Sequence, residues 1–212
     1  MRCTLSGYRN LRRSWSNLKS MSFYVSGDAG IRAAQKATKT IPILAITDDM
    51  LAGGLVNSLS RPNGNTTGVS ILATELDGKR QEILIEAVPG LRRMAALADA
   101  NRAAVGLETL QEAAHARDIE LSIQRVARGE EIAAAIEEAQ SSGAKALNVL
   151  ASPLLYVNRK LIIDRAAALR LPAIFVWAED AEEGGFLAYG PRIIQIYREL
   201  VAQQLVKLLR GV

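Results

Sequence analysis

The stretch from Ile41 to Ser70, IPILAITDDMLAGGLVNSLSRPNGNTTGVS, decides how this chain folds. It begins with an apolar run, Ile43 to Ile46, whose length suits a buried strand. An acidic turn follows, and Asp49 is placed to cap a helix that ends at Arg61-Pro62. A Pro-Asn-Gly-Asn turn then leads into a second β-like segment ending near Val69. The order predicts a strand, a ligand-facing loop, a helix and a passage into a second domain.

Beyond Val69, apolar segments of strand length alternate with helical patterns. The strand candidates include Met94 to Leu97, Ala146 to Ala151 and Ala173 to Trp177. Such alternation predicts βαβ units, parallel sheets and therefore an α/β protein. From about Val69 to Gly185 there are enough elements for one complete doubly wound domain, whereas only two strand–helix units precede it.

The last helical pattern is the most regular. Its apolar residues recur at helical spacing, which predicts a stripe that lies against a hydrophobic partner. These residues are Ile194, Tyr197, Val201, Leu205 and Leu208.

Composition excludes several classes of protein. The chain of 212 residues is 49% apolar and 23% charged, which is ordinary for a globular protein. Its net charge of +4 is spread along the chain and predicts a solvated basic surface rather than nucleic-acid binding. No segment approaches the roughly 18 apolar residues that span a bilayer. The first 22 residues are polar and basic and lack the apolar centre of a secretory signal, so a product translated from Met1 is expected to stay in the cytoplasm.

Catalytic and metal-binding patterns are missing from the sequence. His115 is the only histidine and Cys3 the only cysteine, which argues against a metal site, a disulfide and a Ser-His-Asp or Cys-His mechanism. There is no phosphate-binding loop and no G-x-S-x-G motif. We therefore expect no metal, no cofactor and no enzymatic activity.

Polar or aromatic residues follow nearly every predicted strand. Ligands of open parallel sheets bind outside the carboxyl ends of the strands, so these residues together predict a small-molecule site. For single members such as Asp49 and Ser152, helix capping explains the residue equally well. The predicted ligand-binding residues are Ser26, Gly27, Asp49, Asp99, Asn101, Ser152, Trp177, Glu179 and Tyr189.

Several short motifs are shared with one known family. They are Ile41-Pro42-Ile43, Gly54-Leu55-Val56, Asn63-Gly64-Asn65-Thr66-Thr67-Gly68-Val69, Lys79-Arg80, Glu86-Ala87-Val88-Pro89-Gly90-Leu91, Leu171-Pro172-Ala173-Ile174, Glu183-Gly184-Gly185 and Tyr189-Gly190-Pro191. In combination they resemble the ABC-transporter substrate-binding proteins of the type I periplasmic-binding fold, in the branch related to tryptophan and other amino-acid uptake proteins.

The resemblance implies two doubly wound parallel-sheet lobes that close on a ligand by hinge motion. A partial N-terminal lobe would comprise residues 23–66 and 190–212, a complete C-terminal lobe would comprise residues 67–189, and residues 1–22 would be an irregular basic segment. The crossings would lie at Asn65 to Val69 and at Gly185 to Tyr189. The implied function is solute binding in an inter-lobe cleft for an ABC importer, with permease subunits as partners, a periplasmic location and no insertion into the membrane. The implied ligand is a small polar or amphipathic solute, an amino acid or related carboxylate.

The sequence also departs from the family pattern. Family members tend to carry Asn where Asp99 aligns and Asp where Ser152 aligns, which changes the charge of the site. They also extend further at both ends, so we expect a truncated product with an incomplete N-terminal lobe and weak ligand binding. The alternative functions are a cytoplasmic small-molecule sensor of the same fold and, less well supported, an α/β enzyme.

Overall fold

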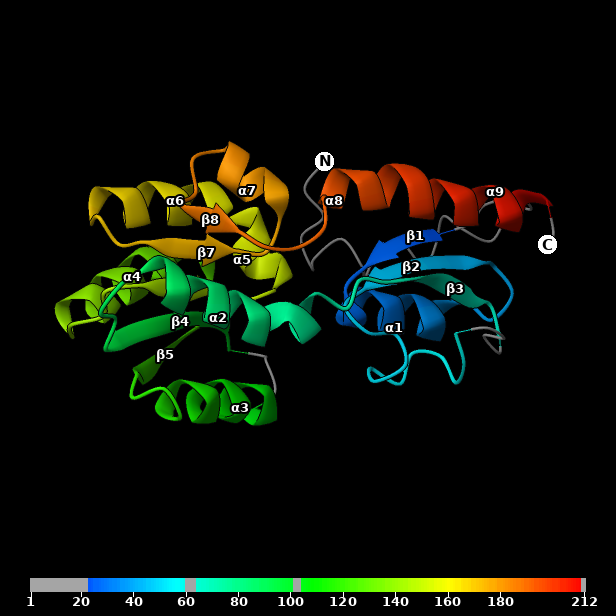
Figure 1. Cartoon of the computed structure of the whole chain (residues 1–212). Helices are drawn as coiled ribbons and strands as arrows, with labels where there is room; N and C mark the ends of the chain where they lie inside the picture. The colour runs from blue at the N-terminus through cyan, green and yellow to red at the C-terminus, as the bar shows by residue number, and fades with distance from the viewer. Residues whose placement is uncertain (1–22, 60–63, 101–103, 211–212) are drawn as a thin grey trace. The chain divides into compact units, whose positions relative to one another are not determined.

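The computed structural model describes residues 23–59, 64–100 and 104–210. The chain forms two compact units. Unit 1 ends at Ile71 and resumes at Tyr197, and unit 2 comprises Leu72–Ile196. Each unit contains a parallel β-sheet with helices packed on it (Figure 1). The predicted α/β class with two parallel-sheet lobes is confirmed.

Unit 1 is built on the three-stranded parallel sheet β1-β2-β3. Its strands are β1 (Phe23–Ser26), β2 (Ile43–Thr47) and β3 (Thr66–Ser70), and its helices are α1 (Asp28–Ala37) and α9 (Ala202–Arg210). Figure 1 shows α1 and α9 on opposite faces of the sheet. All five residues of the central strand β2 are buried, as its apolar composition predicts. On the α1 face, the core is formed by Ile31, Ala45, Met50, Leu55 and Val56.

The helix predicted to begin at Asp49 does not form. Residues 50–54 make turns instead, and Gly54 has a φ of 61°, a value that glycine adopts without strain. One carboxylate oxygen of Asp49, Oδ1, accepts the backbone N–H groups of Leu51 (2.8 Å) and Ala52 (3.0 Å), as in a helix N-cap. The chain then turns at the two glycines, so Leu55 is buried whereas Leu51 is exposed. The capping signal was correct, but the Gly-Gly pair ends the turn before a helix can propagate.

Unit 2 is built on a five-stranded parallel sheet with the order β5-β4-β6-β7-β8. The strands are β4 (Arg93–Asp99), β5 (Glu120–Val126), β6 (Leu147–Val149), β7 (Ala173–Phe175) and β8 (Leu187–Ala188). The α-helices are α2 (Asp77–Ala87), α3 (Ala104–His115), α4 (Ile132–Ser141), α5 (Pro153–Val157), α6 (Arg159–Ala168), α7 (Ala178–Glu182) and α8 (Ile193–Gln195). Two short 3₁₀ turns, η3 (Ala73–Leu76) and η4 (Gly129–Glu131), precede α2 and α4.

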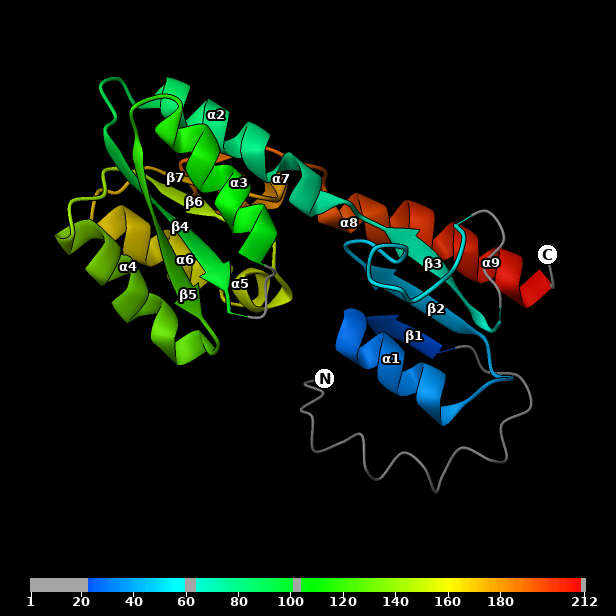
Figure 2. The same ribbon diagram turned by 90° about the horizontal axis from the view of Figure 1, so that it is seen from below.

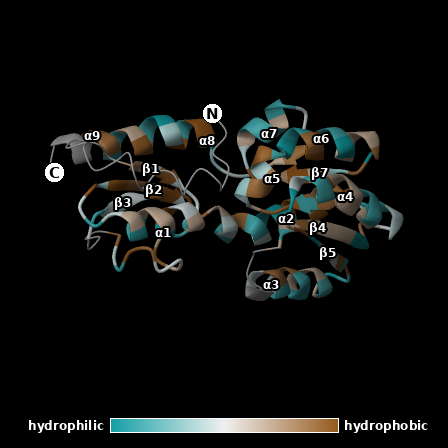
Figure 3. Cartoon of the chain, turned by 180° about the vertical axis from the view of Figure 1, so that it is seen from behind, coloured by the Kyte–Doolittle hydropathy of each residue, from teal (hydrophilic) through white to brown (hydrophobic). Residues whose placement is uncertain are grey.

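Helices cover both faces of the five-stranded sheet, and each face has its own apolar core. Figure 2 shows α2 and α3 on one side of the strands, with α4 and α6 on the other. Alternate residues of the central strands serve the two cores: Leu97 and Leu147 belong to one, Ala96 and Ala146 to the other. Figure 3 shows that β7 is apolar and that the short helix α7 is polar. Burial on both faces explains why these strands read as continuous apolar runs.

The segments expected to pass between the lobes are strands within the sheets. Thr66–Ser70 is paired with β2 along its whole length, and Leu187–Ala188 is paired with β7. Unit 1 therefore extends to Ile71 and unit 2 to Ile196, later in the chain than the expected boundaries after Thr66 and Tyr189.

The final helical region contains a π-helical segment, Ile196–Val201, between α8 and α9. In a π-helix, residues five apart share a face, so the regular helical stripe predicted from the sequence is broken. The structure buries Ile193, Ile196 and Val201, whereas Ile194 is half exposed. Within the stripe, Tyr197 makes an edge-to-face contact with Tyr24 of β1 (6.2 Å between ring centroids). The prediction of one continuously covered stripe was wrong because it assumed α-helical periodicity throughout.

The β2–β3 pair tests the packing of unit 1. A Cβ atom added at Gly68 would lie 1.8 Å from the carbonyl oxygen of Ala45, so the strands cannot stay in place. We expect Gly68→Ala to lower the free energy of unfolding by about 1–3 kcal/mol, the usual cost of overpacking. Gly78→Ala is the matched control, because a Cβ there meets nothing within 4 Å in α2. The measurement is the Tm of each variant, followed by circular dichroism. A Tm for Gly68→Ala that is no lower than that of Gly78→Ala would contradict the packing argument.

Candidate functional site

The order of the strands in unit 2 creates a topological switch point. Strands β4 and β6 are neighbours, but β5, which lies between them in the sequence, is on the outer side of β4. The connections that leave β4 and β6 therefore run to opposite faces of the sheet. In open parallel sheets, the crevice at the carboxyl ends of two such strands is where ligands bind.

Two of the predicted site residues meet at this switch point. Asp99 is the last residue of β4, and Ser152 follows β6. The hydroxyl group of Ser152 donates a hydrogen bond of 2.8 Å to Oδ2 of Asp99. The same oxygen of Ser152 accepts the N–H of Leu154 at 3.0 Å and caps α5. The capping and ligand-facing interpretations of Ser152 are thus compatible. Asn101, the third residue predicted here, lies outside the described residues.

An aromatic pair lies beyond the next strand end. Trp177 follows β7, is only 8% exposed, and contacts the ring of Tyr156 from α5 edge to face (6.1 Å between centroids). The guanidinium group of Arg159 lies over the Tyr156 ring, 4.7 Å from its centre, in a cation–π arrangement. Arg159 is itself held by Glu183, 2.8 Å from its Nη2. The orientation of the aromatic pair is therefore fixed from the side of α6.

Glu179 has a structural partner that the sequence did not reveal. Its two carboxylate oxygens accept the backbone N–H groups of Ile193 and Ile194, each at 3.3 Å, at the start of α8. A carboxylate at a helix N-terminus is favourably placed, and these bonds account for its burial without a ligand. The predicted ligand contact is therefore not needed to explain why Glu179 is buried.

Asp180 is the neighbouring buried carboxylate. It accepts the N–H of Trp177 at 3.1 Å and lies 3.8 Å from Nε of Arg159. Burial raises the pKa of Asp180 from its ordinary value to about 6, against the opposing effects of the Trp177 hydrogen bond and the Arg159 charge. Nearby Glu183 and Glu179 raise the pKa further. The carboxyl end of β7 thus carries an acid whose pKa is raised to about 6.

Tyr189 follows β8, the last strand of the sheet. Its backbone N–H donates to the carbonyl of Phe175 at 3.1 Å, and its side chain is 42% exposed. An exposed aromatic ring at a strand end can contact a ligand, and the role of Tyr189 as a ligand contact stays a prediction.

The carboxyl ends of the unit 1 strands carry the remaining predicted residues. Ser26 ends β1, and the N–H of Gly27 donates to the carbonyl of Ile46 at 2.9 Å. The Gly27 N–H is therefore already hydrogen-bonded within the sheet. Asp49 uses one oxygen to cap the turn after β2, as described above.

Several residues of these strand ends were missed by the sequence analysis. In unit 1, the Thr47 hydroxyl donates to Asp28, and the Met50 N–H donates to the Ser70 hydroxyl at 3.0 Å. Thr47 and Ser70 are the last residues of their strands, which was the signal available for them. In unit 2, Tyr156 and Arg159 were missed. Tyr156 lies within one helical turn of the Ser152-Pro153 cap, and that spacing could have placed it at the same edge.

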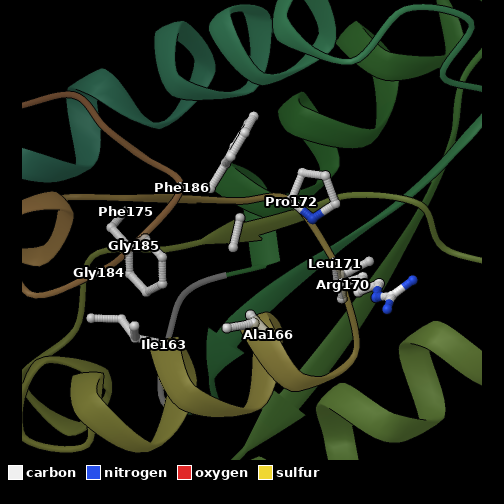
Figure 4. Close-up of a pocket in the computed structure, with 11 residues that line it drawn as sticks. Ile163, Ala166, Arg170, Leu171, Pro172, Phe175, Gly184, Gly185 and Phe186 are labelled. Atoms are coloured by element: carbon white, nitrogen blue, oxygen red, sulfur yellow. The ribbon is translucent and has the colours of Figure 1, made fainter.

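A cavity of about 330 Å³ lies elsewhere in unit 2, beside α6 and the turn before β8 (Figure 4). It is lined by Ile163, Ala166, Ala167, Arg170, Leu171, Pro172, Ala173, Phe175, Gly184, Gly185 and Phe186. None of the predicted site residues lines it, and almost all of its lining is apolar. It lacks the convergent polar groups that orient a specific ligand.

Two negative findings apply to the described part of the chain. Residues 23–59, 64–100 and 104–210 contain no group of three or more His, Cys, Asp or Glu side chains placed to hold a metal ion. Over the same ranges, every helix is too short or too polar to cross a membrane.

The Asp180 environment predicts a dependence of stability on pH. Because the pKa of this acid is higher in the folded chain than in the unfolded chain, its contribution is greatest below about pH 4 and is lost as the pH rises through about 6. Asp180→Asn keeps an acceptor for Trp177 but does not titrate. The difference in Tm, variant minus wild type, should therefore increase between about pH 4 and pH 6.

The control for this measurement is Glu182→Gln. Glu182 is exposed and its pKa is lowered by Arg192, so removing its charge should shift Tm weakly and in the opposite direction as the pH rises. A Tm difference for Asp180→Asn that stays constant across this range would contradict the proposed titration.

Comparison with known proteins identifies the family and similar folds. The family model described as ABC transporter substrate binding protein matches residues 27–212. A conserved domain protein from Vibrio cholerae is 21% identical with a TM-score of 0.81, over 98% of this chain and 70% of that one. An ABC domain in complex with L-Trp from Streptococcus pneumoniae is 19% identical with a TM-score of 0.76, over 98% and 72%.

A third solved structure is a substrate-binding protein with adhesive properties from Clostridium difficile, in a ligand-free, open form. It is 19% identical with a TM-score of 0.61, over 98% of this chain and 70% of that one. No curated protein matches the chain. At these identities the solved structures establish the fold alone, while the family model covers most of the sequence. The chain therefore belongs to the ABC transporter substrate-binding protein family.

Proposed function

We propose that this protein is the solute-binding component of an ABC importer and that it binds a small polar or amphipathic solute at the carboxyl ends of its parallel strands. The proposed ligand class is an amino acid or related carboxylate. Family membership supports a role in solute binding and delivery to permease subunits, and it favours a periplasmic site of action. Nothing in the described site suggests bond-making chemistry, so binding rather than catalysis is proposed.

The observation that carries the proposal is the Ser152–Asp99 hydrogen bond at the switch point. A carboxylate accepts several hydrogen bonds at once, so Asp99 can receive a ligand ammonium or hydroxyl group while Ser152 stays in place. The half-buried ring of Tyr156, backed by Trp177, supplies an apolar surface near the next strand end. Charge, hydroxyl and aromatic groups together are typical of sites for amphipathic solutes.

The other predicted residues have different roles in this proposal. Tyr189 remains a proposed ligand contact because its ring is exposed at the end of β8. Ser26, Gly27, Asp49 and Asn101 also remain proposed contacts. Glu179 is proposed instead to fix the start of α8, given its two amide partners.

Ligand binding can be tested with defined probes. L-Tryptophan is the first probe, because a structurally similar ABC domain contains it. The other common amino acids and small carboxylates complete the panel. A ligand that binds only the folded protein raises Tm, by mass action. We expect at least one panel member to do so and to show saturable binding by isothermal titration. A full panel without binding would contradict the proposal.

Variants at the switch point then locate the site. We expect Asp99→Asn to weaken binding of the active probe by roughly 10- to 100-fold, because a hydrogen bond to a charged group is lost. Ser152→Ala should weaken it less. Ser141→Ala is the matched control, because its hydroxyl is exposed on α4 and bonds only its own helix. Equal affinities for wild type and Asp99→Asn would place the site elsewhere.

A further inference from the structure

Arg80 is the largest fully buried polar side chain of unit 2. It lies on α2, and its relative exposure is 0%. A buried guanidinium group is costly unless it is paired and hydrogen-bonded, so its partners show what the charge is used for. Those partners belong to the two segments through which the chain enters and leaves unit 2.

The first set of contacts fixes the entry segment. The chain enters unit 2 at Leu72 and makes the 3₁₀ turn Ala73–Leu76 before α2. Nη2 of Arg80 donates to the carbonyl of Ala73 at 2.6 Å and forms an ion pair with Asp77 at the start of α2. The guanidinium group therefore holds the first turn of the unit against its first helix.

The second contact fixes the exit segment. Nη1 of Arg80 donates to the carbonyl of Tyr189 at 3.1 Å, 109 residues further along the chain. The next residue, Gly190, packs so closely on β7 that a Cβ atom would lie 2.2 Å from the carbonyl oxygen of Val176. The chain is thus held to the sheet immediately before it continues into α8 and leaves the unit after Ile196.

The segments that connect unit 2 to unit 1 both contain an unusual backbone conformation. Leu72, directly before the anchored turn, has φ 55° and ψ 33°, a left-handed conformation that a leucine rarely adopts. The exit passage contains the π-helical segment Ile196–Val201, which spans the boundary of the units. Conformations of this kind persist where the surrounding structure determines them, and π-helical turns recur at functional positions.

We propose that Arg80 is a positioning residue that anchors both connections to unit 2, so that bending between the units is confined to the residues outside its contacts. On the entry side these residues are Ile71 and Leu72. On the exit side they begin after Ile194, because Glu179 also holds the amides of Ile193 and Ile194 to unit 2. The proposal holds for any solute, because it rests on the Arg80 contacts rather than on the switch-point site.

The test measures the spread of distances between the two units in the full chain. Cys3, the only cysteine, is replaced by Ser, and spin labels are attached to Lys36→Cys on α1 and Glu112→Cys on α3, both exposed positions. Pulsed electron double resonance then gives the distance distribution. We expect Arg80→Met to broaden the distance distribution relative to the otherwise identical Arg80 protein. Both samples are frozen from a temperature at which circular dichroism shows them to be folded.

The matched control is Gln81→Met. Gln81 is the next residue on α2, is equally buried, and bonds the carbonyl of Leu110 in α3 at 2.9 Å rather than either connection. It should lower Tm without broadening the distribution. If Arg80→Met does not fold, Arg80→Lys carries the test, since one ammonium group cannot span both carbonyl groups as the guanidinium fork does. An unchanged width in the folded Arg80 variant, or equal broadening in Gln81→Met, would overturn the proposal.

Discussion

The site of unit 2 depends on the polarity of its parallel sheet. All five strands run in the same direction, so every carboxyl end lies along one edge, and each connection must begin there. The order β5-β4-β6-β7-β8 then makes the connections after β4 and β6 diverge to opposite faces. Asp99 and Ser152 are far apart in the sequence, yet this topology brings their side chains within hydrogen-bonding distance. The strand order therefore determines which side chains meet at the candidate site.

Buried charges around this edge serve two different purposes. Arg80 bonds the backbone carbonyls of Ala73 and Tyr189 and pairs with Asp77, and Glu179 accepts the amides of Ile193 and Ile194. Such contacts fix chain segments that are not held by strand pairing. Asp99 and Ser152 lie at strand ends and are only partly buried, so water or a solute can reach them. The degree of burial therefore separates Arg80 and Glu179 from the candidate ligand contacts Asp99 and Ser152.

The sequence predicted those features that depend on local periodicity and on position after a strand. Alternating apolar segments located the strands of unit 2, and Asp99, Ser152 and Trp177 lie at or shortly after the ends of β4, β6 and β7, as their positions in the sequence indicated. It could not reveal that two glycines stop the turn after Asp49, or that a π-helical segment rotates the apolar face between Ile196 and Val201. The partners of Glu179 were equally hidden, because the amides of Ile193 and Ile194 come from a helix 14 and 15 residues away.

In the proposed site, the orientation of an amino-acid ligand would depend on which protein groups are already hydrogen-bonded. Among the predicted site residues, the Gly27 amide is bonded to the carbonyl of Ile46, and the Glu179 carboxylate is bonded to the start of α8. A ligand carboxylate at the switch point would be repelled by Asp99 and would compete with it for the Ser152 hydroxyl. A ligand ammonium group would instead be attracted by the Asp99 carboxylate. We therefore propose that the cationic end of an amphipathic solute binds at Asp99, with its apolar part toward Tyr156.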